Sequence, residues 1–225
     1  MSFDSQIIAI GDIHGCYKSC EAMLSQLQQE NEAETIYVFL GDYTDRGPNS
    51  KKVVDQLLEF EKNHECIFIR GNHDQMLLDA YENGEWDLWL ANGGNTTLRD
   101  YNSHPKEFNL PESHYRFFCE TKLYWQSENY FFVHGGLNPN LTIAENLERE
   151  HEREEFIWQR SHIHTSKNKW EKTVVFGHTP VKKPLVREKM IGIDTGCVYN
   201  KRGLAKLTAV VLPEQKFIQQ KSLDA

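Results

Sequence analysis

The sequence lacks long hydrophobic runs, and no stretch of its 225 residues approaches the roughly 20 apolar residues that a membrane-spanning helix needs. The first residues, Met1 to Gln6, lack the basic segment and apolar stretch of a secretory signal. The five cysteines are an odd number and form no Cys-x-x-Cys pair, which argues against a disulfide framework and a thiolate zinc site. We therefore expect a cytoplasmic protein with no membrane partner.

Basic residues are also in short supply, since 25 Lys and Arg stand against 33 Asp and Glu, for a net charge of −8. Nucleic acids and anionic membranes bind cationic surfaces, so we expect no nucleic-acid partner. The hydrophobic fraction of 39% includes 12 Phe, 9 Tyr and 5 Trp, which is too apolar for a disordered chain. The length fits one domain over residues 1–225, and it predicts no oligomeric state.

The first third of the chain alternates between two patterns. Short apolar runs at 6–10, 35–40 and 66–70 are typical of buried strands, and amphipathic patterns at 16–29 and 49–60 predict helices. Gly11, Gly41 and Gly71 end the three runs at intervals of 30 residues, about the length of one strand–helix–strand unit. Two such crossovers make a parallel βαβαβ sheet, and the polar residues after its strands should meet at one edge.

The rest of the chain predicts a helical cap followed by more strands. Residues 75–126 look helical and rich in aromatic residues, with one turn at 92–95. Strand patterns resume at 129–133, 173–176, 190–193, 204–212 and 216–219. The charged stretch 145–155 is typical of a solvated helix face. Together these patterns predict an α/β chain.

Polar side chains, most of which can bind metal, follow five of these strands. They are Asp12 and His14, then Asp42, Asp45 and Arg46, then Asn72, His73 and Asp74, then His134, and finally His178. Carboxylate, amide and imidazole groups without thiolates suit Mn²⁺, Fe, Zn²⁺ or Co²⁺. The set is too large for one tetrahedral ion, which indicates two metals that share a carboxylate.

Each of these residues has an ordinary explanation when it is taken alone. An Asp after a strand is usually a helix N-cap, and a single His is usually a hydrogen-bonded polar residue. The regular spacing of three strings argues against that explanation for the set. These strings are GDIHG at 11–15, GDYTDRG at 41–47 and GNHD at 71–74.

The three strings resemble the GDxHG, GDxxDRG and GNH[DE] signature of the phosphoprotein phosphatase (PPP) family, within the calcineurin-like metallophosphoesterases. Further strings, at 89–94, 157–160, 176–180 and 193–196, are similar to those of bacterial and bacteriophage lambda-type protein serine/threonine phosphatases. The resemblance spans essentially the whole chain. It implies a metallophosphoesterase β-sandwich flanked by helices, in α/β/β/α order, with a helical cap in the middle.

The resemblance also implies roles for individual residues. Six would bind two divalent ions, with Mn²⁺ expected first and Fe, Zn or Co as alternatives: Asp12, His14, Asp42, Asn72, His134 and His178. Asp42 would bridge both ions. Arg46 and Arg160 would grip the phosphate, and Asn72 and His73 would also contact substrate. His73 would be the general acid and Asp45 the carboxylate paired with it, whereas Asp194 would only support the His178 loop.

Three functions are compatible with these residues. We expect a protein serine/threonine phosphatase that could also act on phosphotyrosine. A metal-bridging hydroxide would attack the phosphate of a phosphoprotein or phosphopeptide directly. The alternative is a symmetrical diadenosine tetraphosphatase, whose phosphate leaving group needs less protonation. Asp45 favours the phosphatase, because an alkoxide leaving group needs a well-oriented acid. A non-catalytic module that has kept the fold predicts a missing site residue, and none is missing.

The remaining candidates are mostly assigned to structure. Cys16 and Cys20 should pack in the core. His64, His104, His114, His151, His162 and His164 should be exposed. Arg70 could reach substrate or end a strand in solvent, and Arg99 with the turn at 92–95 could line a substrate groove.

Overall fold

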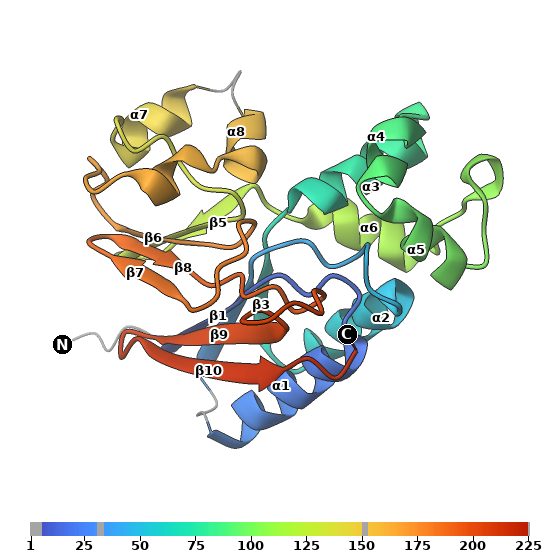
Figure 1. Cartoon of the computed structure of the whole chain (residues 1–225), viewed down its shortest axis with the longest axis horizontal. Coiled ribbons are helices and arrows are strands. Elements are labelled where there is room, and N and C mark those ends of the chain that lie inside the picture. Colours follow the sequence, from blue (N-terminus) through green and yellow to red (C-terminus); the bar gives the residue numbers. More distant parts are fainter. Residues whose placement is uncertain (1–5, 31–33, 150–152, 225) are drawn as a thin grey trace.

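Two five-stranded sheets, stacked face to face with helices on both outer sides, form the centre of the molecule (Figure 1). The computed structural model describes residues 6–30, 34–149 and 153–224. The arrangement confirms the expected α/β sandwich flanked by helices. Among the described residues, no helix has the length and apolar character that crossing a membrane requires.

The first sheet contains the predicted parallel unit. Its strand order is β10-β9-β1-β2-β3. The strands are β1 (Gln6–Ile10), β2 (Thr35–Phe39), β3 (Glu65–Phe68), β9 (Lys206–Leu212) and β10 (Lys216–Lys221). Strands β1, β2 and β3 are parallel, and α1 (Tyr17–Glu30) and α2 (Ser50–Phe60) connect them. The 30-residue spacing of the glycines therefore gave the correct topology, because each crossover carries one helix.

The second sheet has the order β4-β5-β6-β8-β7. Its strands are β4 (Tyr124–Gln126), β5 (Tyr130–Val133), β6 (Thr173–Phe176), β7 (Leu185–Arg187) and β8 (Met190–Gly192). Strand β4 corrects the prediction of helix up to residue 126, and β7 was not predicted. Both have three residues, too few to show an alternating pattern, and both form by antiparallel pairing with a neighbouring strand.

Alternation along the strands divides the core into layers. Ile7 and Ala9 of β1 pack between the two sheets, whereas Ile8 and Ile10 face the helices that cover the first sheet. Successive side chains of a strand point to opposite faces, so one buried strand serves both layers. The outer face of the second sheet has its own cluster, which includes Phe131, Val133 and Phe176.

Short helices cover the upper part of the molecule in Figure 1. The cap contains α3 (Asn72–Asn83), α4 (Trp86–Ala91), α5 (Gly94–Asp100), the 3₁₀ turn η1 (Pro105–Glu107) and α6 (Glu112–Glu120). The second sheet carries α7 (Ile143–Glu148), α8 (Arg153–Trp158) and the 3₁₀ turn η3 (Ser161–His164). The charged stretch 145–155 therefore contributes to two helices, and its residues 150–152 lie outside the described residues.

Candidate metal centre

The loops that follow β1, β2, β3, β5 and β6 bring the predicted ligand residues together at one edge of the sandwich. All six side chains are buried: Asp12, His14, Asp42, Asn72, His134 and His178. Close approach depends on glycine, because a Cβ at Gly71 would overlap Asp42 and a Cβ at Gly177 would overlap Asp12. The glycines of the sequence motifs thus allow carboxylates and backbone to meet at the site.

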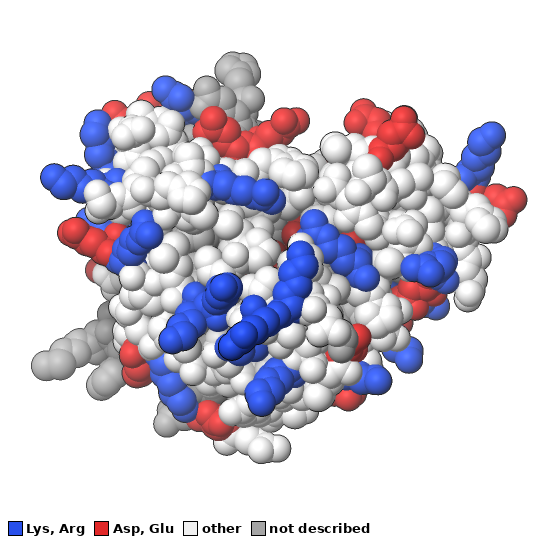
Figure 2. Space-filling view, in the orientation of Figure 1, with Lys and Arg blue, Asp and Glu red and all other residues white. Residues whose placement is uncertain are grey.

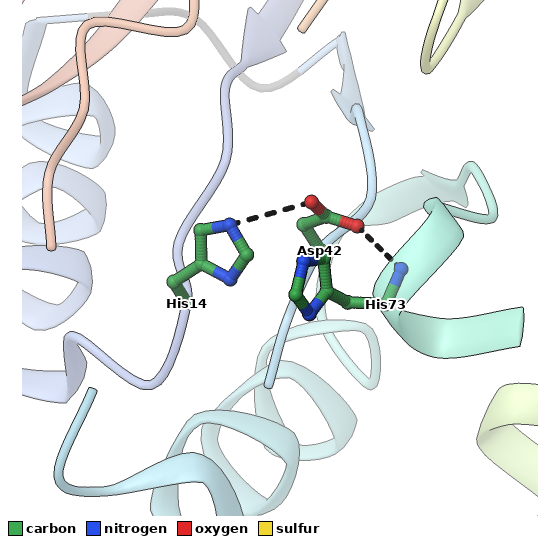
Figure 3. Close-up of side chains that lie close together, drawn as sticks. All are labelled: His14, Asp42 and His73. Carbon is green, nitrogen blue, oxygen red and sulfur yellow. Dashed lines mark hydrogen bonds and ion pairs between the residues drawn. The ribbon is translucent and has the colours of Figure 1, made fainter. Parts of the chain in front are cut away.

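Asp42 lies between His14 and His73 (Figure 3). Its Oδ2 is 3.3 Å from Nε2 of His14, and its Oδ1 is 3.4 Å from Nε2 of His134. The backbone N–H of His73, in the first turn of α3, donates to Oδ1 at 3.0 Å. Burial opposes ionisation of Asp42, but His134 and His73 hold its pKa well below its usual range. A charged carboxylate thus faces two separate imidazoles.

The hydrogen bonds of His134 show that this pocket fits a cation. Its Nδ1 donates to the backbone oxygen of Leu40 at 2.7 Å, and its Nε2 lies 3.0 Å from Oδ1 of Asn72 and 3.4 Å from Oδ1 of Asp42. Three acceptors that converge in a buried space need a cation between them. Burial lowers the pKa of His134, but Asp42 raises it to about 10, so a proton is held where a metal ion would serve the same purpose.

Within the described part of the chain, two groups of side chains could hold metal ions, and they share Asp42. The first is His14, Asp42 and His73, and the second is Asp42, His134 and His178; within each, the ligand atoms lie within 4.8 Å of one another. The first group contains His73 where the sequence predicted Asp12. The Asp12 oxygens lie close by, because both accept the backbone N–H of His178 at 3.1 Å.

One arginine accompanies each histidine group. Nη1 of Arg46 is 2.7 Å from Nε2 of His14, and Nε of Arg160 donates to Nε2 of His178 at 2.8 Å. Since Nδ1 of His14 bonds to the backbone oxygen of Thr44, its Nε2 carries the lone pair that accepts from Arg46. The two guanidinium groups lie where an anion at the centre could contact them.

His73 and Asp45 form a buried pair, with Nδ1 2.8 Å from Oδ2. Nε2 of His73 is buried and has no hydrogen-bond partner in the part of the chain that the structure describes. Asp45 also accepts from Nε1 of Trp89 at 2.8 Å and from Oγ1 of Thr97 at 2.6 Å. The carboxylate therefore orients His73 and at the same time attaches α4 and α5 to the site.

Trp89 and Thr97 were not singled out as site residues from the sequence. The available signal was the tryptophan-containing segment before the glycine turn at 92–95, which belongs to the resemblance. The turn itself lies against Arg46, whose backbone N–H donates to the oxygen of Gly93 at 3.3 Å. Arg46 and Arg99 both line a cavity of about 470 Å³; that Arg99 and the turn line a substrate groove stays a prediction.

The site loops have unusual backbone geometry. Five non-glycine residues have φ between 47° and 71°: His14, Asp42, Asp45, Arg46 and His178. Such left-handed conformations cost about 1–3 kcal/mol each and persist only where surrounding contacts enforce them. Asp74 supplies such contacts, since its carboxylate accepts the backbone N–H groups of Asp42, Tyr43 and Gly71.

Several other predictions are corrected. His114 is buried and bonds to Asp55 and Tyr101 rather than lying in solvent. His162 is also buried, His64 is half-buried, and only His104 and His164 are exposed as expected; His151 lies outside the described residues. Burial of these rings follows from tertiary contacts that join distant segments.

Arg70 does neither of the two things considered for it. Its guanidinium bonds to Gln75, Thr121 and backbone oxygens at the end of α6, so it joins the end of β3 to the cap. Asp194 accepts the N–H of Gly196, and its backbone oxygen accepts the N–H of Val181. Cys16 and Cys20 are in the core, as predicted.

His162 fills the space beside Gly136, where a Cβ would overlap its ring. The ring also packs on Phe176 at 4.4 Å between centroids, and neither nitrogen has a hydrogen-bond partner among the described residues. Burial lowers its pKa to about 4, from the ordinary value of 6.5. Folding therefore requires a neutral ring, and the unfolded chain binds the extra proton as the pH falls.

We expect the His162→Phe variant to be less sensitive to acid than the wild type. Between pH 6.5 and 4, protonation favours the unfolded wild-type chain, so stability falls by up to about 1.4 kcal/mol per pH unit. Urea unfolding at pH 7.5 and 5 measures this loss, and His104→Phe, at an exposed position, is the control. Equal losses of unfolding free energy between pH 7.5 and 5 in the wild type and in His162→Phe would contradict this prediction.

Comparison with known proteins gives a consistent picture. The family model described as calcineurin-like phosphoesterase matches residues 5–209. The asymmetrical bis(5'-nucleosyl)-tetraphosphatase PrpE of Oceanobacillus iheyensis is 30% identical and covers 95% of this chain and 91% of its own. Serine/threonine-protein phosphatase 1 of Salmonella typhimurium is 28% identical and covers 84% and 86%. A solved structure provisionally described as a diadenosine tetraphosphatase has a TM-score of 0.71 and 20% identity, covering 100% and 96%, so it bears on the fold alone.

Proposed function

Because this chain belongs to the calcineurin-like phosphoesterase family, we propose that it hydrolyses dinucleoside polyphosphates asymmetrically, into a nucleoside monophosphate and a nucleoside triphosphate in the case of a tetraphosphate. The observation that carries the proposal is the similarity to the PrpE tetraphosphatase over nearly the full length of both chains. This similarity favours the diadenosine tetraphosphatase, which was the alternative from the sequence, over the protein phosphatase. The cleavage that we propose is asymmetrical, whereas the sequence alternative was symmetrical.

The role of Asp45 supports this change of preference. From the sequence, Asp45 favoured a phosphomonoesterase because it could orient a general acid. In the structure its carboxylate also accepts from Trp89 and Thr97. Replacing it would leave these buried donors without a partner, which costs about 1–3 kcal/mol for each group. The residue therefore has a structural use in an enzyme that cleaves either kind of substrate.

The six ligand residues of the centre would hold two divalent ions, and we propose Mn²⁺, with Fe, Zn or Co as alternatives. When bound, such ions lower the pKa of water and offset the charge of the phosphate. Arg46 and Arg160 would bind phosphate oxygens through paired N–H groups, a geometry that lysine cannot reproduce. Asn72 would contact substrate as well as metal. His73, oriented by Asp45, would hold a proton on Nε2 for the leaving oxygen.

A second candidate function is a protein serine/threonine phosphatase. The buried His73–Asp45 pair favours it, because an alkoxide is a poor leaving group that needs such a proton donor. The relative from Salmonella typhimurium bears that name. The substrate would then be a phosphoprotein or phosphopeptide, and phosphotyrosine would also be tested.

Hydrolysis of diadenosine tetraphosphate and a phosphopeptide panel, side by side with Mn²⁺, tests the proposal. We expect the purified protein to convert the dinucleotide to AMP and ATP, with a kcat/KM about 100-fold above that for any phosphopeptide, in the range of specific enzymes. Chelator should abolish the activity, and Mn²⁺ should restore it, because the ligand set fits divalent ions. Two ADP as products, faster phosphopeptide cleavage, or full activity in chelator would each contradict part of the proposal.

We further propose that the whole chain is one metallophosphoesterase domain, because the two sheets share a core and the family model spans residues 5–209. A cytoplasmic location and the absence of a nucleic-acid or membrane partner stay predictions from composition.

A further inference from the structure

Two accessible aromatic rings flank the metal centre, and neither takes part in the chemistry described above. Tyr199 belongs to the loop between β8 and β9, and Trp158 is the last residue of α8. Tyr199 is half-buried, and the Trp158 side chain is 37% exposed. Each ring therefore has surface that a ligand can contact.

Tyr199 lies beside the arginine of the first histidine group. Cζ of Arg46 is 5.7 Å from the centroid of its ring, and Nζ of Lys201 is 5.5 Å from the same centroid. Arg46 in turn contacts His14. The ring is thus adjacent both to the centre and to two cations that could bind phosphate groups.

Trp158 lies beside the second histidine group. Its ring is perpendicular to that of His178, with 5.9 Å between the centroids. His178 accepts from Arg160, and its ring is 4.9 Å from that of His134. A path of direct contacts therefore runs from one aromatic ring to the other through the centre: Tyr199, Arg46, His14, Asp42, His134, His178 and Trp158.

The charges on the two sides differ. Lys and Arg side chains gather in the middle of the face in Figure 2, around the position of β9, whereas Asp and Glu side chains gather near α8. The exposed Lys201, Arg202 and Arg99 belong to the Tyr199 side, where Asp100 and Asp224 line the same cavity as Arg99. The exposed Glu154 belongs to α8, and Arg160 is the cation on the Trp158 side. Cations attract phosphate groups, so the Tyr199 side suits the longer part of a polyphosphate.

We propose that Tyr199 and Trp158 are two nucleobase-binding platforms, one on each side of the metal centre. This inference rests on the proposed function, since only a substrate with two nucleosides uses both rings. A dinucleoside tetraphosphate would lie across the histidines with one base against each ring. The triphosphate part would lie toward Tyr199 and Lys201, and the monophosphate part toward Trp158. The reaction itself is unchanged: water adds to phosphorus, and the phosphoanhydride bond breaks.

Binding of a methylene-bridged diadenosine tetraphosphate and of linear inorganic tetraphosphate, measured by calorimetry with Mn²⁺, tests the platforms. Both ligands contain four phosphates, so the ratio of their Kd values measures what the nucleosides add to binding. We expect Tyr199→Ala and Trp158→Ala each to reduce this ratio about 10-fold, as loss of one base–aromatic stack predicts. Tyr199→Phe and Trp158→Phe should keep most of the preference, because they retain a ring.

The matched control is Tyr17→Ala. Tyr17 also has a cation near its ring, with Nζ of Lys52 5.7 Å from the centroid, but it lies on α1 beside α2. We expect this variant to keep the wild-type ratio. Binding of the products tests the orientation of the substrate. Tyr199→Ala should weaken the binding of ATP more than that of AMP, and Trp158→Ala should weaken the binding of AMP more than that of ATP.

The outcomes separate this inference from the proposed function. If the wild type cleaves diadenosine tetraphosphate but both alanine variants keep the wild-type Kd ratio, the platforms are wrong and the function stands. If each variant weakens the binding of ATP and of AMP equally, the proposed orientation of the substrate is wrong. If the wild type neither binds nor cleaves the dinucleotide, the proposed function and the platforms fail together.

Discussion

The Asp42→Asn variant is expected to bind at most one ion per chain and to lose kcat/KM by on the order of 10³-fold, because Asp42 is the ligand that the two proposed ions would share. The carboxylate faces His14 with one oxygen and His134 with the other. Asparagine has one oxygen, so its NH₂ group would face one of the imidazoles. It also lacks the negative charge that would attract the two cations.

Metal analysis after dialysis against Mn²⁺, together with turnover of diadenosine tetraphosphate, measures both effects. Asp87→Asn makes the same change of charge on the exposed side of α4 and is the control. It should retain two ions and wild-type turnover. Two ions per chain in Asp42→Asn would show that the carboxylate does not bridge them.

The His73→Asn variant is expected to lose about 10²–10⁴-fold in kcat on a serine phosphomonoester, the contribution usual for a general acid. The loss on an aryl phosphate should be much smaller, because that leaving group departs without a proton. A dinucleoside polyphosphate should resemble the aryl phosphate, since its leaving group is a stabilised phosphate. The buried Nε2, which lacks a hydrogen-bond partner among the described residues, is the atom that would hold the proton.

The same variant also distinguishes a proton donor from a ligand. His73 forms a possible metal group with His14 and Asp42, so its loss could remove an ion instead of a proton. Metal analysis should still show two ions in His73→Asn if His73 is the acid. Equal losses of kcat on the serine and aryl substrates, or one missing ion, would end that assignment. Asp45→Asn tests the positioning role and should shift the pH profile of the remaining activity.

Strands β1, β2 and β9 of the first sheet were predictable because they are buried on both faces. Such strands appear in the sequence as continuous apolar runs, and β1 begins and ends where its run does. Strand β4 was not predictable, since two of its three residues are exposed and its pairing with β5 decides its conformation. Boundaries elsewhere shifted by one or two residues, where local hydrogen bonds end each element.

That the proposed ligand residues gather at one edge was predictable, because each follows a strand within a glycine motif. The residues that support or extend the site were not, because they come from distant segments. Trp89 reaches Asp45 across 44 positions of sequence, and Thr97 reaches it across 52. His162 was wrongly expected in solvent, since only the tertiary structure shows that the empty side of Gly136 accommodates its ring. Local pattern carries no information about such contacts.

The left-handed backbone of the site loops has a consequence for engineering. Glycine adopts positive φ without the steric penalty of a side chain, so at Arg46 it would relieve part of the backbone cost. It would also remove the guanidinium proposed to bind phosphate. Selection for heat resistance alone would therefore favour substitutions that remove residues of this centre. A mutant library designed to raise thermal stability should keep the site loops unchanged and vary the helical surface instead.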